Sequence, residues 1–342
     1  MHILSRAPFA LTAYGLPHSM GYIPTRTGDA HPKPLSVLEF MDLAVDLRLE
    51  GVEFPLLSRV PSFDGTVVSV AESNVDLASE LKQRGLRLIA DYGALLDQPL
   101  SHIEEYLELA ARTGANVVRA TLSHILCGDR RALPGGWLKQ MDELVIRLRS
   151  ILPTAERLGI CIAVENHQDA TTEDLLDLAD RTGNSSSFGI TLDAGNPLAV
   201  GQDPLEAAVA LAHIIRHVHL KDYTMHFAPE GYRLVRCAAG DGVVDFPAIL
   251  TAVRGNGHNV LPGIEVAAQA TRTVPILESS WWAEFPQRDA QSLLPALALL
   301  WKHGRPAHEP YSSSWENGEN SAVVASEELA IVRKSADYLR TL

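Results

Sequence analysis

The feature that most constrains this fold is a repeated alternation of short β-rich runs with helical patterns. Eight β-rich runs occur, at 9–16, 51–57, 86–93, 116–123, 160–167, 188–193, 214–222 and 261–267. Strands that alternate with helices pair in parallel through right-handed crossovers, and eight such units match the usual size of a closed barrel. We therefore predict an α/β fold, a (β/α)₈ TIM barrel, over residues 1–285.

Several of the helical patterns end at a glycine, which is the residue that most readily adopts the left-handed conformation that closes a helix. Gly51 follows the pattern at 36–50, and the patterns at 74–85, 103–114 and 144–159 each end with a glycine. A doubly wound open sheet is the alternative architecture. It is disfavoured because no strand is followed by a glycine-rich dinucleotide fingerprint.

Residues 286–342 follow the barrel and contain an apolar helix, a polar link and an amphipathic last helix. We predict that they form a C-terminal helical extension. The last helix would pack either on the barrel or on another subunit of a homo- or hetero-oligomer, and the sequence leaves both open.

Charge and hydropathy exclude several functions. The formal net charge of −13 repels phosphate backbones, so we expect no nucleic acid partner. No segment approaches the ~20 apolar residues of a membrane helix, and the first residues lack a long apolar leader. Three widely separated cysteines fit reduced thiols. We predict a cytoplasmic protein that does not bind membranes.

Polar side chains end the last four predicted strands, namely Glu165, Asp193, His219 and Glu265. Each follows an apolar run, and an unpaired charge buried there is costly. Barrel strand ends meet at one face, where three carboxylates would repel one another unless a cation lies between them. We therefore predict one divalent metal ion. Mixed oxygen and nitrogen ligands favour Mn²⁺, with Mg²⁺, Co²⁺ and Zn²⁺ as alternatives.

The residues beside these ligands have several interpretations. His167 lies two residues after Glu165 and so on the same side, where it is either an acid or base for the substrate or a loop cap. We interpret His217 as a core histidine that bonds to a backbone carbonyl. Lys221 is either a surface charge or a substrate contact.

Further polar side chains lie at or just past strand ends and are weaker candidates for the mouth, namely Glu53, Asp91, Arg119 and His124. The stretch 223–245 exceeds the usual connection length, so we predict a lid in which Arg233 or Arg236 contacts the substrate. Trp281 and Trp282 follow the eighth strand. They would stack on a sugar ring or form subunit contacts.

The segments "AVENHQD", "TLDAGN", "HVHLKDY" followed by "GDGVVDF", and "GIEVA" carry a family resemblance. Over about residues 8 to 285 the chain resembles the xylose-isomerase-like barrels, which include sugar isomerases and epimerases, inosose dehydratase and endonuclease IV. The resemblance implies that Glu165, Asp193, His219 and Glu265 bind one divalent metal. Asn196 departs from the pattern, since many members place a histidine there.

These features predict a metal-dependent isomerase or epimerase that removes a proton next to a metal-bound carbonyl of a keto sugar. Glu165, Glu265 and His167 are the expected catalytic residues. The expected substrate contacts are Asn196, Lys221, Arg236 and Trp281. The alternative is a lyase or dehydratase that acts by β-elimination on a keto sugar or keto-glycoside. An abasic-site DNA endonuclease and a non-catalytic binding barrel are weaker alternatives.

Overall fold

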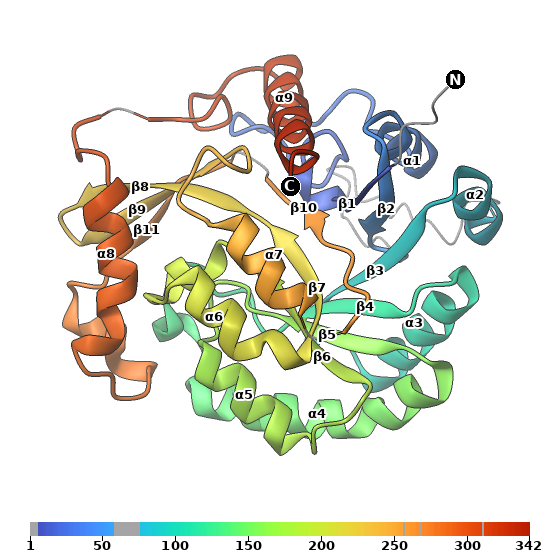
Figure 1. The fold of residues 1–342 in the computed structure, drawn as a ribbon, viewed down its shortest axis with the longest axis horizontal. Coiled ribbons are helices and arrows are strands. Elements are labelled where there is room, and N and C mark those ends of the chain that lie inside the picture. Colours follow the sequence, from blue (N-terminus) through green and yellow to red (C-terminus); the bar gives the residue numbers. More distant parts are fainter. Residues whose placement is uncertain (1–5, 58–75, 256, 267–268, 310) are drawn as a thin grey trace.

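Eight parallel strands close into a barrel in a computed structural model that describes residues 6–57, 76–255, 257–266, 269–309 and 311–342 (Figure 1). The strands are β1 (Ala7–Thr12), β2 (Leu49–Phe54), β3 (Arg87–Ala94), β4 (Val117–Thr121), β5 (Cys161–Glu165), β6 (Phe188–Asp193), β7 (Ile215–Leu220) and β10 (Gly263–Ile264). Their order around the barrel is β1-β10-β7-β6-β5-β4-β3-β2. The predicted (β/α)₈ barrel is confirmed.

Helices surround this barrel, and all six residues of β6 are buried, as expected for a parallel strand covered on both faces. The helices are α1 (Val37–Asp46), α2 (Leu77–Arg84), α3 (Leu100–Thr113), α4 (Trp137–Leu158), α5 (Thr172–Arg181), α6 (Pro204–Leu211) and α7 (Phe246–Arg254). Short 3₁₀ turns occupy Ala13–Gly15, Arg130–Ala132, Asn196–Val200, Ala212–Ile214, Ser279–Glu284 and Gln291–Leu293.

Glycines close three of the helices as predicted. Gly85, Gly114 and Gly159 follow α2, α3 and α4 with φ of 60°, 87° and 67°. The prediction is wrong for Gly51, which lies inside β2 while α1 ends at Asp46. A Cβ on Gly51 would lie 2.8 Å from the carbonyl oxygen of Arg87, so close strand packing explains this glycine.

The segment predicted to be a lid forms regular structure. It contains β8 (Asp222–Ala228) and β9 (Gly231–Cys237), which pair antiparallel, and β11 (Arg272–Val274) joins the edge of β9. This small sheet extends outward from the end of β7 (Figure 1). Its strands bury Tyr223, Met225, Tyr232 and Leu234 in a second hydrophobic cluster. Residues 222–237 are therefore a paired β-hairpin, and the lid role of 223–245 stays a prediction.

Asp222 fixes the loop that follows the small sheet. Its carboxylate accepts hydrogen bonds from the backbone N–H groups of Gly240, Gly242 and Val244, at 2.9, 2.9 and 3.1 Å. A Cβ on Gly242 would lie 2.1 Å from Asp222 Oδ1. Glycine is therefore required where the backbone closes on this carboxylate.

Two further helices follow the barrel strands, α8 (Leu294–His303) beside β8 and α9 (Ser321–Leu339). Val332, Ala336 and Leu339 of α9 belong to the main core, so the last helix packs on the barrel. Glu328 of α9 accepts hydrogen bonds from the backbone of His18 and Ser19. Among the described helices, none has the length and hydropathy needed to cross a bilayer.

Candidate metal centre and active site

The four predicted metal ligands meet at the carboxyl ends of neighbouring strands. Glu165 ends β5, Asp193 ends β6, His219 lies in β7 and Glu265 directly follows β10. Each offers a ligand atom, and these atoms all lie within 4.8 Å of one another. All four residues are at most 6% exposed.

Each glutamate divides its two oxygens between a cationic side chain and His219. Glu165 Oε2 forms an ion pair with Arg119, and its Oε1 lies 3.7 Å from Nδ1 of His219. Glu265 Oε1 lies 2.7 Å from Nζ of Lys221, and its Oε2 lies 2.8 Å from the same Nδ1. That nitrogen is buried and makes no hydrogen bond of acceptable geometry. A cation beside it would meet two carboxylate oxygens that no cationic side chain occupies.

Asp193 is held in place from two strands. Its Oδ1 accepts hydrogen bonds from the backbone N–H groups of Gly195 and Asn196, and its Oδ2 pairs with Lys221. Asn166 accepts from the backbone N–H of Asp193 at 2.7 Å and donates to its carbonyl oxygen at 3.1 Å. Asn166 therefore ties the ends of β5 and β6 together. Asn166 was not among the site residues expected from the sequence, although its polar side chain directly follows Glu165.

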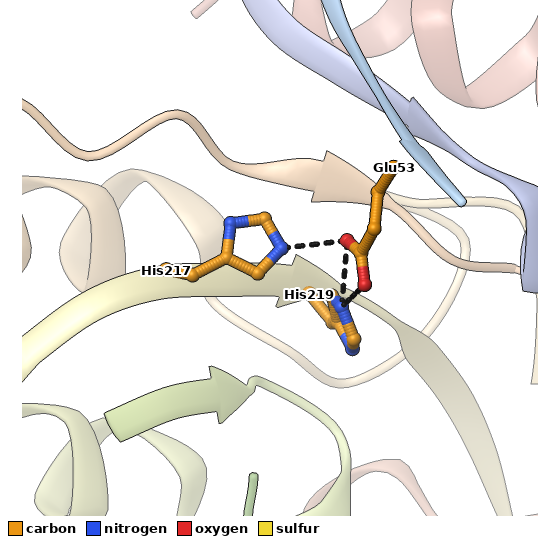
Figure 2. Close-up of side chains that lie close together, drawn as sticks. All are labelled: Glu53, His217 and His219. Atoms are coloured by element: carbon orange, nitrogen blue, oxygen red, sulfur yellow. Dashed lines mark hydrogen bonds and ion pairs between the residues drawn. The ribbon is translucent and has the colours of Figure 1, made fainter. Parts of the chain in front are cut away.

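Glu53 orients the His219 ring by contacting Nε2, on the side of the ring away from Glu165 and Glu265 (Figure 2). His219 Nε2 lies 3.0 Å from both oxygens of Glu53, so it is placed to donate there and to leave Nδ1 facing the other ligands. His217 Nδ1 donates to the carbonyl oxygen of Leu261 at 2.9 Å, as predicted, and its Nε2 lies 2.7 Å from Glu53. Burial would raise the pKa of Glu53, but the two histidines lower it to about 2.

Glu53→Gln should weaken Mn²⁺ binding by about 10- to 100-fold, because second partners of ligating histidines typically have effects of this size. The amide keeps the shape of the carboxylate but not its charge. Titration of metal-free protein with Mn²⁺ measures the change. The control is Glu105→Gln, at an exposed position on α3. Equal affinity in the two variants would contradict the orienting role of Glu53.

The charges around these residues favour a divalent ion. The buried carboxylates of the region outnumber its buried cationic side chains; the acids are Glu53, Asp91, Glu165, Asp193 and Glu265, and the cations are Arg119 and Lys221. Burial would lower the pKa of His219, but Glu53, Glu265 and Glu165 raise it well above its usual value, so positive charge is favoured at this ring. Three carboxylates and one imidazole therefore fit Mn²⁺ or a similar ion.

Both glutamates are held in the ionised form. Burial would raise the pKa of Glu165, but Arg119 and His219 outweigh it and lower the pKa below its usual range. Burial would likewise raise the pKa of Glu265, but Lys221 and His219 lower it. Asp193 differs, since burial outweighs Lys221 and raises its pKa to about 6.

His167 is the neutral polar group of the site. Burial lowers its pKa to about 4, and the charges of Glu165, Arg119 and Lys221 also act on it. Its Nδ1 is buried and has no hydrogen-bond partner within the described part of the chain. The structure therefore places His167 next to the ligands with a nitrogen available for proton exchange.

Other expected residues also gather here. Lys221 is 1% exposed, so the surface alternative is wrong and its ammonium group lies among the ligands. Asn196 Nδ2 lies 3.4 Å from Glu165 Oε1, and its Oδ1 is buried without a partner. Arg119 bridges Asp91, at 2.7 Å, and Glu165. Arg236 of β9 lies close enough for the charges of Glu265 and Asp193 to act on it.

Three residues expected to contact the substrate or to lie near the mouth do not join this cluster. Trp281 is 0% exposed, and its indole N–H donates to the carbonyl oxygen of Cys127 at 2.9 Å, so the prediction of an open stacking face is wrong for this ring. Arg233 pairs across the sheet with His226, on the face opposite to Arg236. His124 has a 76% exposed side chain and pairs with Asp97.

Comparison with known proteins agrees with this geometry. A 3-oxo-isoapionate decarboxylase from Pectobacterium atrosepticum is 31% identical over 123 residues, which cover 35% of this chain and 44% of that protein. The chain spans less than two thirds of the length of the curated relatives it matches.

Solved structures share the fold. An L-ribulose 3-epimerase structure is 15% identical with a TM-score of 0.55, and 98% of each chain is covered. A xylose isomerase-like TIM barrel protein from Mycobacterium smegmatis in complex with magnesium is 16% identical with a TM-score of 0.57, covering 88% of this chain and 99% of that one. The family model for the xylose isomerase-like TIM barrel matches residues 41–283. This chain therefore belongs to the xylose isomerase-like TIM barrel family.

Proposed function

We propose that this protein is a divalent-metal-dependent lyase that acts on a keto sugar or a derivative of one. The observation that carries the proposal is the pairing of Glu165 with Arg119 and of Glu265 with Lys221. Isomerases and epimerases that use two carboxylates need both to exchange protons near neutral pH. Each of these carboxylates gives one oxygen to a cationic side chain and turns the other toward His219, which suits ligands better than proton carriers.

A divalent ion held by Glu165, Asp193, His219 and Glu265 would polarise a carbonyl group and its neighbouring hydroxyl. His167 then takes the proton from the carbon beside the carbonyl, because its Nδ1 has no hydrogen-bond partner among the described residues, whereas both glutamates are held by cationic side chains. The electron pair of that C–H bond forms the enediolate. Its collapse expels a substituent from the next carbon, together with the bonding electrons.

Loss of CO₂ is the related route for a 3-oxo acid, since the pair from the breaking C–C bond enters the same kind of enolate. Similarity to the 3-oxo-isoapionate decarboxylase supports this route. The second candidate is isomerase or epimerase activity. It is favoured by the approach of Glu165 and Glu265 to His219 from β5 and β10, which are separated in the barrel by β6 and β7.

The test is incubation of Mn²⁺-loaded protein in D₂O with 3-oxo sugar acids, keto-glycosides and simple keto sugars, followed by NMR and mass spectrometry. We expect loss of CO₂ or of a substituent. Chelator-treated protein is the control. A product of unchanged formula with a moved carbonyl or an inverted carbon would instead establish the isomerase or epimerase alternative.

A further inference from the structure

Two arginines lie on one face of the small sheet, at the end nearest the barrel. Arg236 is on β9, and Arg272 begins β11. Arg272 pairs with Leu234, which is two residues from Arg236, so both side chains project from the same face. Arg236 pairs in turn with Tyr223, which follows Lys221 by two residues. The face therefore starts beside the metal ligands.

Electrostatic effects connect this face to the site. Burial would lower the pKa of Arg236, but the charges of Tyr223 and Glu265 raise it. Arg272 is one strand farther out, because β9 separates β11 from β8, and burial and the charge of Arg236 lower its pKa. Lys221, Arg236 and Arg272 thus form a row of positive charge that leads outward from the metal centre.

The charge of Arg272 lacks a matching acid. Within the described ranges, no carboxylate forms an ion pair with Arg272, and its Nε is buried without a hydrogen-bond partner. Glu316 is the carboxylate whose charge acts on Arg272. Its oxygens already accept hydrogen bonds, Oε1 from the backbone N–H of Thr271 and Oε2 from the backbone N–H of Ser313. A partly buried guanidinium beside a second one is stabilised by a bound anion, and its planar fork fits a carboxylate or a phosphate.

We propose that Arg236 and Arg272 form an anion subsite, so that the substrate carries a carboxylate or phosphate group and is a keto sugar acid or a sugar phosphate. This inference rests on the proposed function, since it assumes that the sugar itself is held at the metal centre. Arg272 was not among the residues expected from the sequence, because only the pairing of β11 with β9 brings it to the same face as Arg236.

The test is titration of the Mn²⁺-loaded protein with D-gluconate, inorganic phosphate and the uncharged sorbitol. We expect gluconate or phosphate to bind at least about tenfold more tightly than sorbitol. Arg272→Gln should weaken anion binding by about 10- to 100-fold, the range for hydrogen bonds to charged groups. Arg233→Gln, on the other face of β9, should leave it unchanged. Tighter binding of phosphate identifies a sugar phosphate, and tighter binding of gluconate a sugar acid.

Equal binding of the anions and sorbitol, or wild-type anion binding in Arg272→Gln, would overturn the subsite. Arg272→Lys keeps the charge and should bind more tightly than Arg272→Gln, which separates a lost contact from a misfolded protein. Anion binding is measured without turnover, so it is independent of the lyase proposal. If only the lyase proposal fails, anions still bind and the product is isomerised. If only the subsite fails, neutral keto sugars are cleaved and Arg272→Gln has the wild-type KM.

Discussion

Asp193→Asn and Glu165→Gln proteins are each expected to lose about a thousandfold or more in activity, because removing a ligand charge forfeits several kcal/mol of stabilisation and each factor of ten corresponds to about 1.4 kcal/mol. Their fold should persist. Lys221 keeps Glu265 as a partner in the first variant, and Arg119 keeps Asp91 in the second. Elemental analysis should find less than one ion per chain in each variant.

The matched control for this loss is Glu156→Gln, which changes an exposed glutamate on α4. Thermal unfolding checks that all variants are folded. A full complement of metal in the Glu165→Gln, Asp193→Asn double variant would show that the ion binds elsewhere. Active wild-type protein without metal would also refute the assignment of these ligands.

The barrel was predictable because its signal is local and repeated. Each strand is a short apolar run, and three glycines close helices with the expected left-handed backbone. The ligand cluster was predictable for a related reason. Parallel barrel strands all end at one face, so the residue that ends each strand has a known neighbourhood even without distances.

What the sequence did not reveal depends on contacts between distant segments. Lys221 looked like a residue beyond a strand end, but β8 begins immediately afterwards and buries it. The hairpin in the segment expected to be a lid pairs with β11 to form a three-stranded sheet, and no local sequence pattern predicts that pairing. Gly51 followed a helical pattern as a cap would, yet it makes space for packing against β3. In each case the partner strand, rather than the residue's own neighbours, determines the outcome.

His167→Gln should lower the rate by about 10²- to 10⁴-fold, the usual contribution of a positioned acid or base, while one ion per chain remains bound. The reason is a division of tasks. Glu165 and Glu265 are fixed by Arg119 and Lys221, whereas His167 Nδ1 has no hydrogen-bond partner in the ranges that the structure describes. Metal content and rate, measured on the same preparation with the keto substrate that the wild type converts, separate these roles.

The control for this substitution is His124→Gln, because His124 is exposed and pairs only with the exposed Asp97 among the contacts described for its side chain. In D₂O, His167→Gln should also lose incorporation of deuterium at the carbon beside the carbonyl. If the His167→Gln variant keeps both the wild-type rate and this exchange, Glu165 and Glu265 transfer the proton and His167 does not. Glu165 and Glu265 would then carry the proton despite their ion pairs with Arg119 and Lys221, and an isomerase or epimerase would be favoured over a lyase on this barrel.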